Sequence, residues 1–190
     1  MLLTVAFVPP VPMLDALNTI VDKAGWRPGD LERIPAPEMQ MSVAAFGNVT
    51  SGDMAHLVSA LSRLSDGWPA APTLRFTGGA ALEWPGDQTV WAKLAGGVDA
   101  LDEVAQSIAP AMLRLGYAVD RRRYRPWLPV GTVTATTPLD FLERLLVRLE
   151  AHVGDPWEAS HLSLLRTAFD AGRSGSQGFE VLREFSLPPP

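Results

Sequence analysis

Proton transfer near neutral pH depends on few side chains in this sequence. The chain has three histidines, His56, His152 and His161, and histidine is the side chain whose ordinary pKa lies closest to neutral. The string His161-Leu162-Ser163 is the one place in the sequence with a His-x-Ser pattern. No second histidine motif accompanies it, so the sequence favours a strand histidine with an ordinary hydrogen bond over a catalytic residue.

Neither metal nor covalent chemistry is indicated. The chain has no cysteine, which removes disulfides, thiolate metal sites and cysteine nucleophiles. The histidines do not follow a spacing such as His-x-x-x-His, so we expect no zinc or other metal. We interpret His56 as a solvated or boundary residue of a helix. We interpret His152 as a residue of a last helical turn, where its partial positive charge meets the helix dipole. No cofactor motif stands out, and we expect no cofactor.

The segment Arg121-Arg122-Arg123-Tyr124-Arg125 is the one basic cluster. Because an aromatic ring lies among its cations, the cluster could hold phosphates or stack a base. The alternative is a solvated strand entry, balanced by Asp120, whose neighbouring arginines point to opposite faces. The net charge of -5 disfavours generic coating of DNA or RNA, so any nucleic-acid contact must come from such a local patch.

The composition is that of a compact folded chain. At 190 residues, with 47% apolar residues, 19% charged residues and 17 prolines, the chain can bury a core and make many turns. The apolar run Leu2 to Val8 lacks a basic leader and is too short for a signal peptide or a membrane span, so we interpret it as a buried strand. We expect a cytoplasmic bacterial protein with no membrane partner.

Hydrophobic periodicity predicts alternating strands and helices. Strands are predicted at Leu2 to Val8, Met39 to Phe46, Val90 to Leu94 and Arg125 to Thr134. Helices are predicted at about Pro12 to Ala24, Ser51 to Leu64, Asp99 to Leu115 and Pro138 to His152. A short hairpin is predicted from Thr73 to Phe76 and Ala81 to Trp84, around Gly78-Gly79. A closing hairpin, about 157-187, is predicted from Trp157 to Arg166 and Phe179 to Leu187, with a flexible loop at Ala171 to Gly178.

The second half of the chain repeats the order of the first at a shift of 87 residues. The shift lays Leu14-Asp15 on Leu101-Asp102, and Thr50-x-x-Asp53 on Thr137-x-x-Asp140. Matches in the same order and at one shift support an internal duplication, with halves at about 1-64 and 89-152.

The duplication indicates a candidate site. Alternate residues of a strand share a face, so Gln40 and Ser42 point the same way, and so do Trp127 and Pro129 at the same shift. A pseudo-twofold axis between the halves would turn these two faces toward each other across a cleft. Trp127 either plugs this cleft or offers an aromatic platform. We interpret the other tryptophans as core or turn anchors, namely Trp26, Trp68, Trp84, Trp91 and Trp157.

The order of elements and the residues at both motif positions resemble the two-histidine (2H) phosphoesterase superfamily, in its 2'-5' RNA ligase or RNA 2',3'-cyclic phosphodiesterase branch. Gln40 to Gly47 resembles the first His-x-Thr/Ser motif of that family, and Tyr124 to Val130 the second, with Pro126 just before the histidine position. Flanking segments also resemble the family, namely Leu2 to Pro9, Val90 to Leu94, Leu115 to Tyr117, Gly154 to Trp157 and Phe179 to Leu182. The resemblance implies an α+β fold, with residues 1-190 as a single bilobal, duplicated domain. Two antiparallel sheets would face a central cleft, with helices outside.

The same resemblance predicts a loss of catalysis. In the family, one histidine acts as general base and the other as general acid at a cyclic phosphate, while Thr/Ser hydroxyls hold the phosphate oxygens. Gln40 and Trp127 occupy the two histidine positions; glutamine does not titrate near neutral pH, and the indole N–H cannot accept a proton. Each acid–base group contributes roughly 10²- to 10⁴-fold, so we expect no turnover by the family mechanism. Ser42 keeps one hydroxyl, whereas Pro129 has none.

Three hypotheses follow. The first is a catalytically inactive protein that binds a nucleotide-like or other small ligand, or an RNA end, in a cleft lined by Gln40, Ser42, Trp127 and Pro129, with Arg125, Thr132 and Tyr124 as ligand or phosphate contacts. The second is an active phosphodiesterase on RNA 2',3'-cyclic phosphate ends, which needs a histidine that reaches the cleft from elsewhere. The third is a ligand-free interaction protein in which Trp127 and Pro129 fill the cleft. No protein partner is indicated.

Overall fold

The computed structural model describes residues 1–119, 124–169 and 177–190. Arg121, Arg122 and Arg123, and most of the predicted loop Ala171 to Gly178, lie outside these ranges. The described helices are α1 (Val11–Lys23), α2 (Ser51–Ser65), α3 (Val98–Arg114), α4 (Leu139–Ala151) and the short 3-10 helix η1 (Ala36–Glu38). The described strands are β1 (Leu2–Phe7), β2 (Glu32–Arg33), β3 (Met41–Asn48), β4 (Thr73–Ala81), β5 (Thr89–Gly96), β6 (Trp127–Thr132), β7 (Trp157–Glu158), β8 (His161–Phe169) and β9 (Gln177–Ser186).

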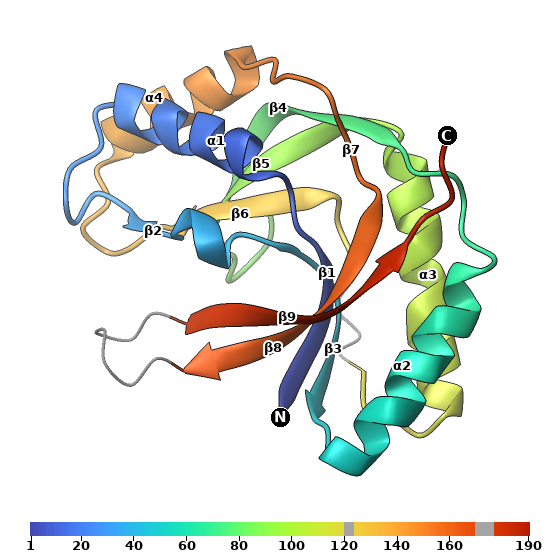
Figure 1. Ribbon diagram of the computed structural model, residues 1–190. Coiled ribbons are helices and arrows are strands. Elements are labelled where there is room, and N and C mark those ends of the chain that lie inside the picture. The colour runs from blue at the N-terminus through green and yellow to red at the C-terminus, as the bar shows by residue number, and fades with distance from the viewer. Residues whose placement is uncertain (120–123, 170–176) are drawn as a thin grey trace.

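The strands form two antiparallel sheets. The first has the order β3-β1-β8-β9, and the second the order β2-β6-β5-β4-β7. Helices α2 and α3 contact the first sheet, and α4 contacts the second. Figure 1 shows the sheets in the middle, with α1 and α4 on one side and α2 and α3 on the other. The predicted α+β class, with two antiparallel sheets and outer helices, is confirmed.

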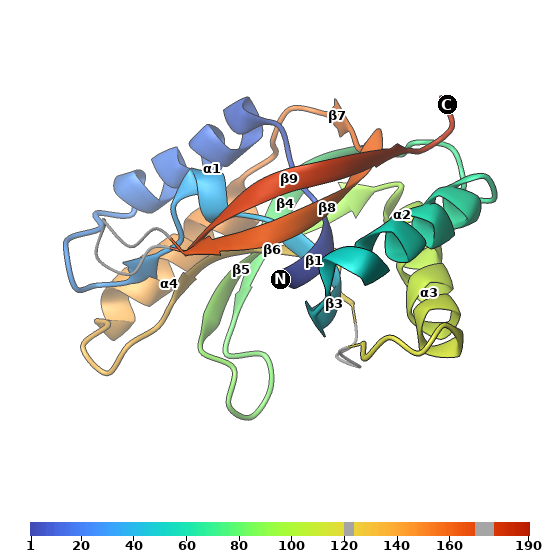
Figure 2. The ribbon, with the colours of Figure 1, turned by 60° about the horizontal axis from the view of Figure 1, so that its bottom comes forward.

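The helix pairs combine elements from both halves of the chain. Helix α1 lies against α4, and α2 lies against α3, as both views of the ribbon show (Figures 1 and 2). Each pair therefore takes one helix from residues 1-64 and one from residues 89-152. This exchange is compatible with the predicted duplication, which itself stays a prediction.

The four helices form where the apolar periodicity predicts them. Helix α1 buries Leu14, Leu17 and Ile20, which recur at helical spacing on one face. Helix α2 begins after Thr50, whose hydroxyl accepts a hydrogen bond from the backbone N–H of Asp53 at 3.2 Å. The related Thr137 does not cap α4, because Pro138 is the residue that precedes this helix.

The two motif strands carry the same irregularity. In β3, Val43 is an extra residue between Ser42, which pairs with Ala6, and Ala44, which pairs with Val5. In β6, Val130 is the extra residue between Pro129, which pairs with Trp91, and Gly131, which pairs with Val90. A bulge of this kind turns the residues that follow it to the other face of the sheet. Val43 and Val130 are related by the same 87-residue shift as Gln40 and Trp127.

The predicted hairpin around Gly78-Gly79 is wrong. Both glycines lie inside the continuous strand β4, and the chain turns only after Ala81. Gly78 has a φ of +86° and lies at a bulge opposite Lys93, which explains the turn-like sequence. A Cβ on Gly79 would lie 2.7 Å from Leu149 Cβ, so this glycine instead allows α4 to pack closely on β4.

The predicted strand from Trp157 to Arg166 is two strands. Trp157 and Glu158 form β7 at the edge of the second sheet, where Trp157 pairs with Leu74. The chain then crosses to the first sheet, where β8 begins at His161 and pairs with both β1 and β9. The closing hairpin is therefore the pair β8–β9, and β7 ties the two sheets together.

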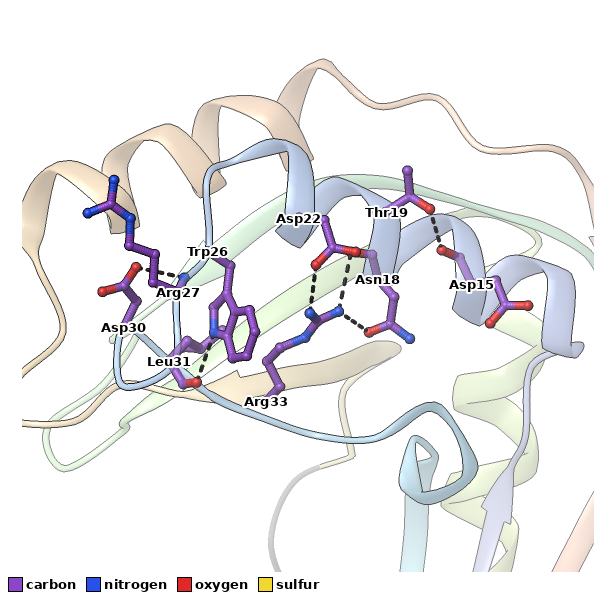
Figure 3. Close-up of polar contacts among 9 residues, drawn as sticks. All are labelled: Asp15, Asn18, Thr19, Asp22, Trp26, Arg27, Asp30, Leu31 and Arg33. Atoms are coloured by element: carbon purple, nitrogen blue, oxygen red, sulfur yellow. Dashed lines mark hydrogen bonds and ion pairs between the residues drawn. The ribbon is translucent and has the colours of Figure 1, made fainter.

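A polar cluster fixes the connection between α1 and β2 (Figure 3). The Arg33 guanidinium reaches back from β2 to the Asp22 carboxylate at 2.7 Å and to the Asn18 amide oxygen at 3.0 Å. It also lies 4.8 Å from the ring centre of Trp26, whose indole N–H donates to the Leu31 carbonyl at 3.1 Å. These contacts hold the short strand β2 against β6, next to the second motif.

Candidate functional site

Trp127, at the second motif position, lies in a group of three tryptophans. Trp91 pairs with Pro129 across β5 and β6, and its ring centre is 6.3 Å from that of Trp127. Trp84, in the connection from β4 to β5, follows at 5.9 Å from Trp91. The rings of Trp127 and Trp91 are half-buried, and Trp84 is 36% exposed. The second motif position is therefore part of an aromatic surface that is open to solvent at one end.

Two cations lie over these rings. The Arg125 guanidinium is 4.3 Å from the ring centre of Trp84 and 5.0 Å from that of Trp127. Lys93, which pairs with Trp127 across the strands, places its ammonium 5.1 Å from the Trp127 ring centre. Such contacts stabilise exposed cations by about 0.5 to 1 kcal/mol each. Within the described ranges neither cation has a carboxylate at ion-pair distance, so both can meet an anion.

The buried carboxylate of Asp87 holds this aromatic group in place. It accepts the Trp91 indole N–H at 3.1 Å and the backbone N–H groups of Glu83 and Thr89 at 3.1 and 3.0 Å. Burial of Asp87 acts to raise its pKa, but the hydrogen bonds from Thr89, Trp91 and Glu83 outweigh burial, so the pKa lies below its ordinary value. Asp87 therefore stays ionised at neutral pH and anchors Trp91.

The other residues of β6 and of the segment before it that were predicted to line the site lie in two different places. Pro129 and Thr132 lie on the same face as Trp127, because the bulge at Val130 brings Thr132 back to that face opposite Thr89. Tyr124 instead packs against the hydrophobic core, and its buried hydroxyl has no partner among the described residues. Burial and then the charge of Asp102 raise the pKa of Tyr124, so its hydroxyl stays protonated.

The first motif lies on the other sheet. Gln40 immediately precedes β3, and its amide oxygen is buried with no hydrogen-bond partner in the described part of the chain. Ser42 is exposed and pairs with Ala6 of β1. Strand β3 contacts β6, which brings the two motif strands together. The buried amide oxygen of Gln40 is an acceptor that a ligand or a water could satisfy.

The three histidines are spread over separate elements. His56 is exposed on α2, His152 follows the last residue of α4, and His161 begins β8. Among the described residues, no group of three or more histidine or acidic side chains could hold a metal ion. The site around Trp127 therefore offers rings, cations and hydroxyls for binding rather than a titrating pair for proton transfer.

The sequence analysis did not predict that four residues belong to this site, namely Trp84, Trp91, Lys93 and Asp87. It assigned Trp84 and Trp91 to core or turn positions, whereas both belong to the aromatic group. The alternation Trp91-x-Lys93 in a predicted strand was the available signal, because it places both side chains on one face. Their position opposite Pro129 and Trp127 depends on the pairing register of β5 and β6.

The fold is similar to that of solved two-histidine phosphoesterase structures, as the sequence resemblance predicts. Escherichia coli LigT in complex with 3'-AMP has a TM-score of 0.76 at 15% identity, over 98% of this chain and 97% of that chain. The protein TT0787 of Thermus thermophilus has a TM-score of 0.74 at 18% identity, over 100% of this chain and 99% of that chain. A structure described as a phosphoesterase has a TM-score of 0.72 at 15% identity, over 98% of each chain.

These likenesses establish the fold of the whole chain. LigT has also been solved in complex with NADP⁺, ATP and phosphate. No protein-family model and no curated protein matches the sequence. No helix in the described ranges combines the length and the hydropathy needed to cross a membrane.

Proposed function

We propose that this protein binds a nucleotide-like ligand, and does not catalyse phosphodiester chemistry, at the Trp127 group. This group consists of the three tryptophans Trp84, Trp91 and Trp127 with the cations Arg125 and Lys93. The observation that carries the proposal is that Trp127 lies beside Trp91, Arg125 and Lys93. The sequence resemblance predicts a histidine at the position of Trp127. Rings that stack a base, next to cations without carboxylate partners, are the features that recognise a nucleotide.

The energetics favour binding over catalysis. Stacking of one base on an aromatic side chain contributes roughly 1 to 3 kcal/mol, and the planar Arg125 guanidinium can hold a phosphate through two hydrogen bonds. The site lacks the side chains that proton transfer needs, because Gln40 does not titrate near neutral pH and the Trp127 indole N–H can only donate a hydrogen bond. The complexes of LigT with 3'-AMP, NADP⁺ and ATP suggest adenine nucleotides as the first ligands to test.

A second candidate is a ligand-free interaction protein. Its supporting observation is that the protein's own Arg125 and Lys93 already lie over the Trp127 ring. A ligand base must therefore displace one of these cations or stack on the more exposed Trp84. If neither happens, the aromatic group is a structural filling of the space between the motif strands.

Isothermal titration calorimetry with 3'-AMP and with adenosine tests the proposal. We expect saturable binding of 3'-AMP, weakened about 5- to 100-fold by Trp127→Ala because a stacking surface is lost. Lys93→Ala should weaken 3'-AMP binding more than adenosine binding, because only 3'-AMP has a phosphate. The chain has one other lysine, Lys23, exposed on α1, so Lys23→Ala is the matched control and should leave both affinities unchanged.

Two outcomes of the calorimetry would contradict the proposal. The absence of saturable binding with either compound, or equal affinity in the parent and in Trp127→Ala, would reject the nucleotide site. The ligand-free candidate would then remain.

A further inference from the structure

A cavity of about 260 Å³ lies away from the Trp127 group, where the chain passes from β7 to β8. One wall is the end of β1 at Phe7 and Val8, another is the segment Trp157–His161, and the rest is formed by side chains of β8 and β9. Because β7 belongs to the second sheet and β8 to the first, the cavity lies at the junction between the two sheets. Its size, at the lower end for small-molecule sites, suits a ligand of about a dozen non-hydrogen atoms or fewer.

The cavity shares a sheet face with the first motif. Ser42 pairs with Ala6, Ala6 pairs with Ser163, and Ser163 pairs with Glu184, so these four residues form one row across β3, β1, β8 and β9. Directly paired residues point to the same face. Ser163 and Glu184 line the cavity. With strands about 4.8 Å apart, Ser163 lies roughly 10 Å from Ser42 along this row.

One buried polar group of the cavity wall lacks a partner. Trp157 is 8% exposed, and its indole N–H is buried with no hydrogen-bond acceptor in the described ranges. Ser163, which is 4% exposed, also lines the cavity and carries a hydroxyl. A buried donor that makes no hydrogen bond destabilises the fold. A hydroxyl or carbonyl oxygen of a ligand that reaches the Trp157 N–H would satisfy it.

The His161 ring presents one free nitrogen. Its Nδ1 is hydrogen-bonded to the Ser160 hydroxyl at 2.7 Å, and both residues line the cavity. The Nε2 atom has no partner among the described residues and can donate to or accept from a ligand, depending on the tautomer. The string His161-x-Ser163 therefore brings an imidazole and a hydroxyl to one cavity.

The charge of the cavity distinguishes it from the Trp127 group. Glu158 and Glu184 both line it, both are exposed, and neither forms an ion pair within the described part of the chain. Two unpaired carboxylates repel a phosphate and attract an ammonium group. The cavity and the Trp127 group thus favour ligands of opposite charge.

We propose that this cavity is a second binding site, for a small amine that also carries hydroxyl groups. Glu158 and Glu184 hold the ammonium group, and the Trp157 N–H and the Ser163 hydroxyl bond the ligand oxygens. The proposal is independent of nucleotide binding at Trp127, because no residue is shared between the two sites.

Serinol, the amine analogue of glycerol, tests the proposal against glycerol and glycerol phosphate. Binding is measured by calorimetry, with saturation-transfer NMR for weak affinities. We expect serinol to bind at least fivefold more tightly than glycerol and glycerol phosphate not to bind. The double variant Glu158→Gln, Glu184→Gln keeps the shape of the cavity and should weaken serinol at least fivefold. Glu143→Gln, which removes an exposed carboxylate of α4, is the control and should have no effect.

Trp157→Phe keeps an aromatic ring and removes the donor, so it should weaken serinol and glycerol alike. Three results would overturn the proposal. They are no serinol binding, equal affinity of serinol and glycerol, and unchanged serinol binding in the double glutamine variant. None of these results bears on 3'-AMP, so a failure here is distinguishable from a failure of the nucleotide site.

Discussion

Trp91 donates its indole N–H to the buried carboxylate of Asp87 at 3.1 Å, and Trp91 is the ring that contacts both Trp84 and Trp127. The bond links the connection between β4 and β5 to the face of the second motif. The orientation of the whole aromatic group therefore depends on one carboxylate.

Asp87→Asn should destabilise the protein and disorder the aromatic group. Asparagine has one acceptor oxygen where the carboxylate has two, so at least one of the donors from Glu83, Thr89 and Trp91 loses its partner. We expect a loss of about 1 to 3 kcal/mol in the free energy of unfolding, measured by urea denaturation at pH 7. An unchanged unfolding midpoint would show that these hydrogen bonds do not contribute to stability.

The contribution of Asp87 should also depend on pH. Its pKa in the folded protein lies below the value in the unfolded chain, which is about 3.9. The stabilisation is therefore complete above the unfolded pKa and is lost as the pH falls through the folded pKa. The difference in unfolding free energy between the parent and Asp87→Asn should be constant from pH 7 to about pH 5 and should shrink below about pH 4. A difference that grows on acidification would contradict this linkage.

Hydrolysis of a short RNA that ends in a 2',3'-cyclic phosphate should not be detectable. The sequence resemblance predicts histidines where Gln40 and Trp127 stand, and two such acid–base groups would each contribute roughly 10²- to 10⁴-fold. The measurement compares the parent with the double variant Gln40→Ala, Trp127→Ala at high protein concentration. Turnover in the parent that the double variant lacks would show that substituted residues have restored catalysis.

Gly79→Ala should destabilise the contact between α4 and β4. The added Cβ would lie 2.7 Å from Leu149 Cβ, so the helix must shift or the strand must bend. Overpacking of this kind costs about 1 to 3 kcal/mol, which thermal or urea unfolding can measure. Gly52→Ala, in the first turn of α2 with no contact under 3.8 Å, is the matched control. It should stabilise by up to about 1 kcal/mol.

Local patterns predict most elements of this fold. The four helices begin and end within one or two residues of their predicted bounds, because helical periodicity and breakers such as Gly25 and Gly116 are local features. The predictions fail where a distant segment decides the outcome. Gly78-Gly79 has turn chemistry, but α4 and β5 pack on both sides of it and hold it within a strand.

The sequence by itself determined the chemistry available at the motif positions. Gln40, Ser42, Trp127 and Pro129 have the same donors and acceptors wherever they lie, so the absence of a titrating pair follows from residue type alone. The tertiary structure decided what surrounds them. Cross-strand register placed Trp91 and Lys93 beside Trp127, and the crossing from β7 to β8 placed Trp157 and His161 in one cavity. Register and crossing depend on contacts between segments that are far apart in the chain, which no local pattern encodes.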